Sequence, residues 1–341
     1  MAASNEDALI MRYARQEILP EIGAVGQARL QSSHAVVVGA GGLGCPALQY
    51  LVAAGLGRIT IVDGDIISLT NLHRQTLYKE DQTGALKADI AVETLRRLNS
   101  DCVLKSVPHA LTPANAETLL ADADIVLDCA DSFAVSYILS DICEEKHLPL
   151  ISASALEFSG YVGGFCGGSP SLRAVFPDLP ERAATCATAG VLGPVVGTIG
   201  AMQAQMTIAQ VLGLEPAPLG QLVTLDLRNY RFGGFRFDNA PEPTGMRLRF
   251  IAPDSIRTED FLVELRDVNE APQPVSPNAN RHSVDDFSPN GPTPNEGQRA
   301  VLCCRSGLRS WQAARRLQTY WSGEISLIAM GDTPETSPKT P

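Results

Sequence analysis

Residues 35–44 read AVVVGAGGLG, an apolar run that passes directly into a glycine-rich loop. A continuous run of branched apolar residues is typical of a buried strand in a parallel sheet. The apolar segment Cys45–Ala54 that follows has the character of a helix. Glycines let a backbone approach a phosphate closely, and a helix N-terminus offers oriented N–H groups and a partial positive charge. We therefore predict a strand, a helix and, between them, a phosphate-binding loop with Gly39, Gly41, Gly42 and Gly44.

Segments of strand and helix character alternate after this loop. The predicted strands are Ala35–Val38, Arg58–Val62, Val103–Val107, Ile125–Cys129 and Leu148–Ile151, and the predicted helices include Lys87–Leu98 and Ser136–Glu145. Such alternation predicts an α/β fold with a doubly wound, mostly parallel sheet. The segments Ser159–Phe165 and Leu222–Arg236 are expected to add antiparallel strands.

The length of 341 residues leaves room for two domains. We predict a large domain over residues 1–236, a linker over 237–252 that contains DNAPEPTG, and a smaller α/β domain over 253–331. The smaller domain is rich in proline and asparagine, with an apolar strand at Ala300–Cys304 and a helical pattern at Leu308–Leu317. Residues 332–341 read as a disordered tail.

Composition excludes several classes of partner and location. A net charge of −11 with only 27 basic residues argues against nucleic-acid binding. The N-terminal residues lack the basic region and apolar run of a signal peptide, and the eight cysteines contain no Cys-x-x-Cys pair, so a reduced cytoplasmic protein is expected. The uncharged stretch Ala183–Leu214 is long enough to span a membrane, but its glycines and glutamines favour a loop and a buried helix. We expect no membrane partner.

Charged and polar residues behind the loop indicate which nucleotide it binds. Asp63 ends the strand after the loop, at the distance expected for an acid that binds a ribose. The loop alone suits NAD or ATP equally, and a glycine turn without a ligand is the structural alternative. Asn71, Arg74 and Lys87 follow closely. Such donors and cations favour ATP adenylation, because they would stabilise charge on the α-phosphate and the leaving pyrophosphate.

Five blocks of sequence together resemble the MoeB/ThiF/HesA family, the prokaryotic relatives of ubiquitin-activating E1 enzymes. The blocks are RYARQ (12–16), residues 36–65, SLTNLHRQTLY (68–78), GALKAD (84–89) and DIVLDCADSF (124–133), and the resemblance covers about residues 9–236. It implies a Rossmann-like adenylation fold and a homodimer. It also implies adenylation, with ATP and magnesium, of the C-terminal glycine of a small ubiquitin-like sulfur-carrier protein that ends in Gly-Gly.

The resemblance also assigns roles to individual residues. Asp63, with Asp65, resembles the ribose site, and Asn71, Arg74, Gln75 and Lys87 resemble the phosphate contacts, with Arg74 and Lys87 as catalytic residues. Asp131 resembles the aspartate associated with Mg²⁺, although an aspartate there could simply cap a helix. Arg15 resembles the arginine that reaches the nucleotide of the neighbouring subunit, although it could be a surface residue.

The sequence departs from the family pattern in two places. Ser136 stands where the family commonly has an arginine. Many members hold a structural zinc with two Cys-x-x-Cys pairs, and Ser171, Ala174, Ala240 and Pro243 occupy those four positions here. Serine, alanine and proline cannot replace a zinc-bound thiolate, so we predict no structural zinc.

Two cysteines are candidates for covalent chemistry. Cys186 matches a loop cysteine that holds a covalent intermediate in some relatives and is dispensable in others. Cys304 opens CRSGLRS, where backbone N–H groups, a helix dipole and flanking arginines would stabilise a thiolate. This loop resembles the active loop of rhodanese domains, which carry sulfur as a persulfide. The segment VELRDVNE (263–270) resembles a rhodanese strand end, with Asn269 where arginine is usual.

The other cysteines and the short length of this domain qualify that assignment. Cys303 is expected to face the other side of its strand, and Cys45, Cys102, Cys129, Cys143 and Cys166 are expected to be inert core residues. The rhodanese-like domain is shorter than usual, so a degenerate, purely structural domain is the alternative to a sulfurtransferase.

The predicted function is ATP-dependent adenylation of a sulfur carrier, followed by sulfur transfer that yields a thiocarboxylate. The expected partners are the carrier and a persulfide donor such as a cysteine desulfurase. The alternatives are an adaptor that binds a ubiquitin-like partner without activating it and, from the loop alone, an NAD oxidoreductase. The sequence leaves the carrier and the pathway open.

Overall fold

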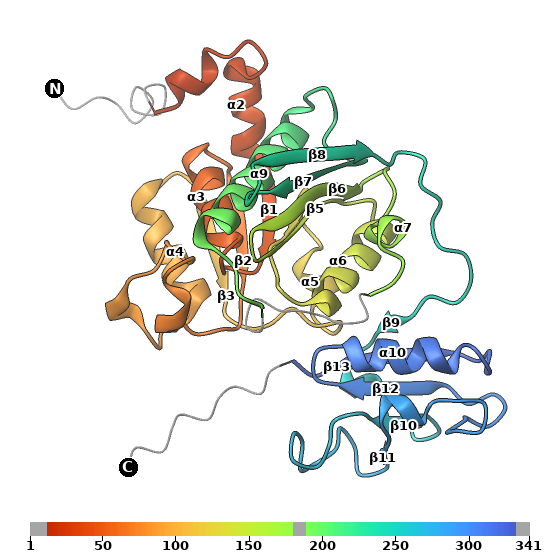
Figure 1. Ribbon diagram of the computed structural model, residues 1–341. Helices are drawn as coiled ribbons and strands as arrows, with labels where there is room; N and C mark the ends of the chain where they lie inside the picture. The colour runs from red at the N-terminus through yellow and green to blue at the C-terminus, as the bar shows by residue number, and fades with distance from the viewer. Residues whose placement is uncertain (1–11, 180–188, 332–341) are drawn as a thin grey trace.

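A computed structural model describes residues 12–179 and 189–331 of the chain. These residues form two sheets, one in the first two thirds of the chain and one near its C-terminus (Figure 1). The larger sheet has eight strands in the order β3-β2-β1-β4-β5-β6-β7-β8. Its parallel part consists of β1 (His34–Val38), β2 (Arg58–Val62), β3 (Val103–Val107), β4 (Ile125–Asp128) and β5 (Pro149–Leu156). The antiparallel part consists of β6 (Ser159–Cys166), β7 (Gln221–Asp226) and β8 (Arg231–Arg236), so the predicted fold class is confirmed.

Helices cover both faces of this sheet because successive residues of a buried strand point to opposite sides. Val37, Ile59 and Leu127 pack towards one face, and Val36, Val62 and Val126 pack towards the other. The first face carries α2 (Gly23–Ser32), α3 (Gly44–Ala53), α4 (Lys87–Leu98) and α9 (Gly193–Leu212). The second face carries α5 (Ala116–Leu119), α6 (Phe133–Glu145) and α7 (Leu172–Val175). Short 3-10 turns lie at Leu69–Asn71, Glu80–Gln82, Pro253–Ser255 and Val284–Asp286.

The long helix α9 accounts for most of the uncharged stretch in the sequence. Within the described residues it is the one helix whose length and composition would suffice to cross a membrane. Half of it is buried inside the protein, where it packs on α3, β5 and β6. It therefore has the surroundings of a core helix in an α/β domain.

The C-terminal domain is built on a five-stranded parallel sheet. Its strands lie in the order β11 (Asn280–Arg281), β10 (Phe261–Glu264), β12 (Ala300–Cys304), β13 (Ile325–Ala329) and β9 (Arg249–Phe250). The last residues of the expected linker thus form β9, which pairs with β13. One face of the sheet packs on α10 (Leu308–Leu317). The expected disordered tail at 332–341 lies outside the described residues.

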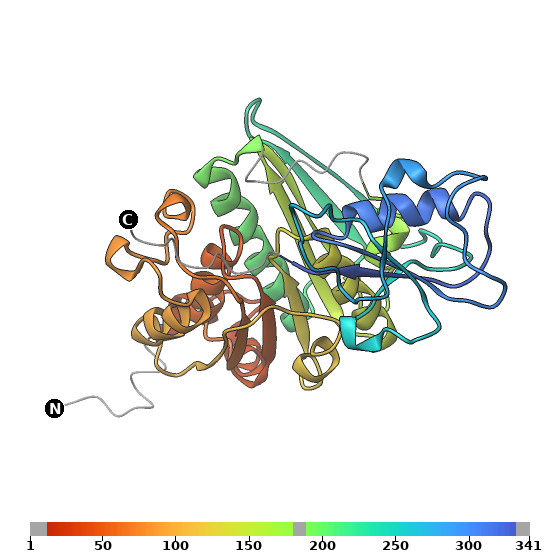
Figure 2. The same ribbon diagram turned by 90° about the horizontal axis from the view of Figure 1, so that it is seen from below.

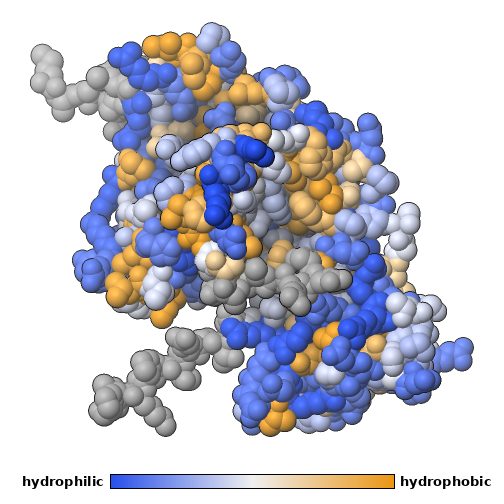
Figure 3. Space-filling view, in the orientation of Figure 1, coloured by the Kyte–Doolittle hydropathy of each residue, from blue (hydrophilic) through white to orange (hydrophobic). Residues whose placement is uncertain are grey.

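The C-terminal domain lies against the face of the large domain that carries α6 and α7, as both ribbon views show (Figures 1 and 2). Trp311 of α10 meets Tyr137 of α6 with ring centroids 5.2 Å apart. Figure 3 shows that the surface of the C-terminal domain is mostly hydrophilic in the same view, whereas hydrophobic patches gather on the large domain.

Candidate active site

The candidate nucleotide site lies where the strand order of the large sheet reverses, between β1 and β4. In open α/β sheets, ligands bind in the crevice outside the carboxyl ends of the strands at such a point. The loop after β1 contains the four glycines, and the loop after β4 contains Asp131. The two loops are close because the Cys129 N–H donates a hydrogen bond to the Val38 carbonyl (2.8 Å).

Two of the glycines are required by the backbone itself. Gly39 has φ +98°, and a Cβ at this position would lie 2.6 Å from the Cys129 carbonyl oxygen. A Cβ on Gly44 would overlap the Gly39 carbonyl. Gly42 lies against Val196 of α9, where a Cβ would meet a methyl group at 3.2 Å. The close backbone contacts of the loop therefore leave no room for a side chain at Gly39 or Gly44.

Asp63 supports this loop directly. Its Oδ2 accepts a hydrogen bond from the Ala40 N–H (2.7 Å), and its Oδ1 accepts one from the Asp65 N–H (2.8 Å). Burial raises the pKa of the Asp63 carboxyl, and the nearby Lys87 ammonium partly offsets this rise. Asp63 therefore braces the glycine loop in addition to the ribose role expected from the sequence.

Lys87 is a buried cation at the first residue of α4. Only 4% of Lys87 is exposed to solvent, and its Nζ lies 2.8 Å from Oδ2 of the exposed Asp65. Arg74 lies in the loop before it, donates to the Thr70 carbonyl (3.3 Å) and lies 2.8 Å from the His73 Nε2, but it forms no ion pair with any described residue. The Asn71 amide contacts only the Thr70 hydroxyl, at 3.5 Å, among the described side chains. Both Arg74 and Asn71 can therefore turn to an anionic ligand.

Gln75 shows that this crevice fits a polar ligand. Its side chain is buried, and its Oε1 has no hydrogen-bond partner among the described residues. Its Nε2 lies 3.4 Å from the position that a Cβ on Gly41 would take. A buried carbonyl oxygen without a partner is costly, so Gln75 is poised to hydrogen-bond something that enters the loop. The glycine loop, Gln75, Lys87 and Asp63 together fit ATP.

Asp131 is exposed in the loop after β4. A single carboxylate suits Mg²⁺ when substrate phosphates supply further oxygen ligands. The described residues contain no cluster of three or more His, Cys, Asp or Glu side chains that would hold a metal alone. Asp131 therefore fits a magnesium ion that arrives with a nucleotide.

Two residues of the site were missed by the sequence analysis. Asp128 is fully buried at the end of β4, where it accepts hydrogen bonds from the Ser152 hydroxyl (2.8 Å) and the Ala130 N–H (3.2 Å). The Tyr78 hydroxyl lies 2.7 Å from the Ala40 carbonyl and 3.3 Å from the Lys87 carbonyl, and so links the glycine loop to the start of α4. Asp128 could have been found from the sequence, because an acid at the end of the apolar run IVLD stands out. No local pattern in the sequence marks Tyr78 as part of the site.

Arg15 is not brought to the nucleotide site of its own chain. It is exposed, and the neighbouring Gln16 donates to the Ala54 carbonyl (3.1 Å) just beyond the C-terminal end of α3. The glycine loop lies at the other end of α3, which is roughly 15 Å long at 1.5 Å per residue. Arg15 therefore lies near the end of α3 that is remote from the glycine loop of its own chain.

The two segments that carry zinc ligands in relatives do lie side by side. Ser171 donates through its N–H and its hydroxyl to the two carboxylate oxygens of Glu242, each at 2.6 Å. A serine–carboxylate contact thus joins the segments here. Cys186, the other candidate nucleophile, lies outside the described residues.

Cys304 lies in a cradle of backbone N–H groups at the start of α10. It is fully buried, and its Sγ accepts hydrogen bonds from the N–H groups of Gly307 (3.2 Å) and Ser310 (3.3 Å). Arg309 in the same loop pairs with Glu270, at 2.7 and 2.5 Å, and donates to the Leu265 carbonyl. The two N–H groups at the start of α10 are thus placed to hydrogen-bond a sulfur atom carried at this position.

The remaining described cysteines are buried and unpaired, as expected for inert core residues. Cys303 faces the opposite side of the sheet from Cys304 and packs with Leu262 and Val301, as predicted. Burial raises the pKa of the Cys303 thiol. It also raises the pKa of Cys45, Cys102 and Cys166 to about 12, and that of Cys129 and Cys143 well above the ordinary value.

Comparison with known proteins identifies the large domain. The profile of the ThiF family matches residues 13–244. Proteins named adenylyltransferase and sulfurtransferase MOCS3 are similar to this chain. The one from Drosophila ananassae is 42% identical to it over the matched region, and the one from Bos taurus is 45% identical. These matches cover 68% and 66% of this chain and 52% and 50% of the relatives, so the matched region spans about half the length of those proteins.

Solved structures show the same fold at lower identity. A crystal structure of E. coli MccB with ATP has a TM-score of 0.60 at 22% identity and covers 67% of this chain and 72% of its own. A crystal structure of PaaA has a TM-score of 0.58 at 22% identity, with coverage of 69% and 75%.

Proposed function

The chain belongs to the ThiF family, and from this premise we propose that it adenylates the C-terminal glycine of a small ubiquitin-like sulfur carrier and then transfers sulfur to it. The observation that carries the proposal is the crevice after β1 and β4, with a fixed glycine loop, the buried cation Lys87 and the unpartnered Gln75 oxygen. The relatives named adenylyltransferase and sulfurtransferase support both halves of the reaction.

In the first step, a carboxylate oxygen of the carrier attacks the α-phosphorus of ATP, and the bond to pyrophosphate breaks. Lys87 would exchange its contact with Asp65 for the phosphates, and Arg74 and Asn71 would turn towards the same charge. Cations held in place at the points where charge develops lower the barrier of such a step. Asp131 would hold Mg²⁺, which supplies further neutralisation of the phosphates.

In the second step, the terminal sulfur of a persulfide on Cys304 attacks the acyl carbon of the adenylate. A carbon–sulfur bond forms, AMP leaves, and the carrier is joined to Cys304 through an acyl disulfide. A thiol, either Cys186 or a small-molecule thiol, then attacks the Cys304 sulfur, releases the carrier thiocarboxylate and leaves a disulfide. A second thiol would then reduce this disulfide by thiol–disulfide exchange, and a persulfide donor such as a cysteine desulfurase would reload the freed Cys304 thiol. This chemistry needs reduced thiols, in keeping with the expected cytoplasmic location.

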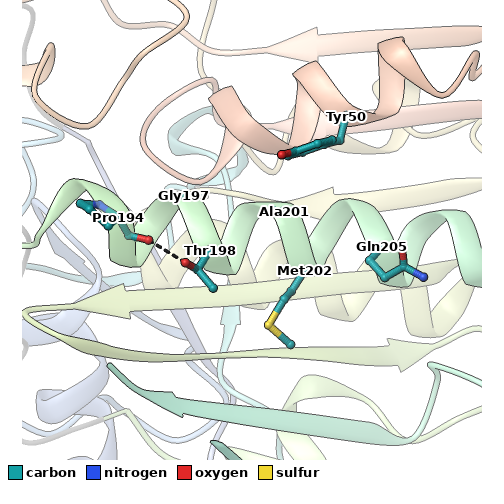
Figure 4. A pocket seen from close by; sticks show the side chains of 7 residues that line it. All are labelled: Tyr50, Pro194, Gly197, Thr198, Ala201, Met202 and Gln205. Carbon is teal, nitrogen blue, oxygen red and sulfur yellow. Dashed lines mark hydrogen bonds between the residues drawn. The ribbon is translucent and has the colours of Figure 1, made fainter. Parts of the chain in front are cut away.

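We further propose that the protein acts as a homodimer. Arg15 lies near the far end of α3 from its own glycine loop, so in the role that the family resemblance assigns to it, a second copy would bring it to the site. A groove of about 590 Å³ lies on the face shared by α3 and α9. Figure 4 shows Tyr50 of α3 facing the α9 residues Gly197 and Ala201, whose small side chains would let another copy approach closely.

Exchange of radiolabelled pyrophosphate into ATP tests the adenylation step, with a panel of small proteins that end in Gly-Gly as carriers. Lys87→Ala should abolish exchange, because it removes the buried cation. Cys304→Ser should leave exchange intact, because sulfur transfer follows adenylation. Exchange that survives Lys87→Ala would refute the assignment of the site. ATP binding without exchange would favour the adaptor, a reading supported by Ser136 at the arginine position of the family.

A further inference from the structure

The loop that carries Cys304 packs against the large domain near the loop that contains Asp131. Gly307, whose N–H binds the Cys304 sulfur, lies against the first turn of α6, where a Cβ on Gly307 would be 3.2 Å from the Ala134 Cβ. Ala134 follows Asp131 by three residues, which span at most about 11 Å. The loop with Cys304 therefore packs on a residue only three positions after Asp131, which lies in the loop proposed to hold Mg²⁺ and nucleotide.

Arg173 lies at the centre of the contact between the domains. Its guanidinium pairs with Asp141 of α6 through two hydrogen bonds of 2.6 and 2.9 Å. The same group donates to the Leu248 carbonyl (2.9 Å), just before β9. It also lies 4.6 Å from the centroid of the Tyr137 ring and 5.5 Å from that of the Trp311 ring. One buried cation thus contacts α6, the chain that enters the C-terminal domain and α10.

Ion pairs between the two domains surround this centre. Arg247 forms a two-fold pair with Glu144 (2.5 and 2.9 Å), Arg249 pairs with Glu145 (2.7 Å), and Arg315 pairs with Asp178 (2.9 Å). Each of these basic residues lies at or beyond the entrance to the C-terminal domain, and each acid lies in the large domain. The contact therefore has both a buried centre and a charged rim, as expected of a specific interface.

We propose that Arg173 is a positioning residue, and that the contact around it holds the Cys304 loop beside the Asp131 loop of the same chain so that sulfur is delivered in cis. This proposal rests on the proposed function. Docking in one chain makes the transfer intramolecular and raises the effective concentration of the sulfur at the adenylate. The Cys304 loop packs on α6 through Gly307, and Cys304 is fully buried, so opening of this contact is expected to expose it.

Charge reversal on the rim tests the contact without removing the buried Arg173. The variants are Glu144→Arg, Arg247→Glu and the double exchange, with Glu93→Arg on the exposed surface of α4 as a charge-matched control. The readout is the rate at which iodoacetamide alkylates Cys304, followed by peptide mass spectrometry on the full-length chain. This measurement needs neither ATP nor a carrier, so it is independent of the proposed function.

Each single variant should raise the alkylation rate of Cys304 about tenfold, because labelling follows the population of the open form. The double exchange should restore the slow rate, and Glu93→Arg should behave like the wild type. Equal rates in all five proteins would overturn the proposed positioning contact.

A second experiment measures thiocarboxylate formation on a carrier that supports pyrophosphate exchange, and so tests whether the contact positions Cys304 for sulfur transfer. The single variants should keep wild-type exchange but form thiocarboxylate about tenfold more slowly from a persulfide donor. They should form it normally from free sulfide, which attacks the adenylate directly and displaces AMP without Cys304. A loss of exchange or of the sulfide reaction would mean a general structural defect and would contradict a positioning role.

Complementation decides whether delivery is in cis. Lys87→Ala and Cys304→Ser chains, carrying different tags, are co-expressed and purified together. The mixed assembly should remain unable to form thiocarboxylate from the persulfide donor, because no single chain has both centres. Restored formation would show transfer between chains and overturn the proposal. Absence of exchange with every carrier would instead refute the proposed function, and delivery in cis with it.

Discussion

Two buried ionisable side chains near the ends of β2 and β4 are stabilised in different ways. Lys87 has a carboxylate partner, Asp65, at 2.8 Å. Asp128 forms no ion pair with any described residue and is held by the Ser152 hydroxyl and the Ala130 N–H. Because burial disfavours a charge without a counter-ion, the pKa of Asp128 is raised to about 6. Asp128 also orients the loop that contains Asp131 through its contact with Ala130.

The raised pKa of Asp128 predicts a pH dependence of stability. An unfolded aspartate has a pKa of about 3.9, so the native state binds the proton more tightly and the free energy of unfolding falls as pH rises from about 4 to about 6. The full effect corresponds to about 3 kcal/mol. Asp128→Asn should remove this fall, as measured by urea unfolding across that pH range. An unchanged pH profile in the variant would show that another group is responsible.

At the level of elements, α9 has an inner side that packs on this chain and an outer side that lines a groove. Its inner side packs on the glycine loop, where Val196 meets Gly42 and a Cβ on Gly200 would overlap the Leu43 carbonyl. Its outer side lines the groove with Gly197 and Ala201. A helix without charged residues is stable in water only when most of its surface is covered. The inner face is covered by this chain, and the outer face is the one assigned above to a second copy.

This assignment predicts that a bulky cation on the outer face of α9 breaks the dimer. Ala201→Arg should sediment as a monomer in analytical ultracentrifugation and should lose pyrophosphate exchange, because Arg15 no longer reaches the partner's nucleotide. Its circular dichroism should match that of the wild type, since Ala201 is not in the buried core. Ala114→Arg, in an exposed loop, is the matched control and should remain dimeric. A dimeric, active Ala201→Arg protein would exclude this face as the interface.

At the scale of the whole molecule, direct side-chain contacts join the two segments for which no structural zinc is predicted. Ser171 and Glu242 are joined by two hydrogen bonds of 2.6 Å. Arg247, which pairs with Glu144, also lies 3.8 Å from Glu242. These contacts fix the start of the linker on the large domain, next to the surface where the C-terminal domain docks.

A chelator should therefore leave the thermal midpoint unchanged, whereas Glu242→Ala should lower it. Loss of two hydrogen bonds to a carboxylate costs about 1–3 kcal/mol, or roughly 2–4 °C for each kcal/mol in a domain of this size. Glu296→Ala, at an exposed position, is the control and should change stability by less than about 0.5 kcal/mol. Calorimetry with and without EDTA measures both effects. A midpoint that falls with EDTA would reveal a stabilising metal.

Much of the site could be predicted because its signals are local. The helix predicted at Lys87–Leu98 coincides with α4, and the strand at Val103–Val107 coincides with β3. The glycines fall where a loop with φ +98° and close backbone contacts requires them. Asp63 and Lys87 could be assigned to the site because they end a strand and begin a helix in characteristic motifs.

The sequence by itself determined the order of strands and helices, the glycine loop and the cysteine loop, because hydrophobic periodicity and glycine placement act over a few residues. Only the tertiary structure decided that Asp128 is buried without a counter-ion and that Arg15 lies at the far end of α3 from its own loop. It likewise decided that Glu242 meets Ser171 and that Arg173 joins α6 to α10. These features depend on contacts between residues far apart in the chain and on the burial that such contacts create.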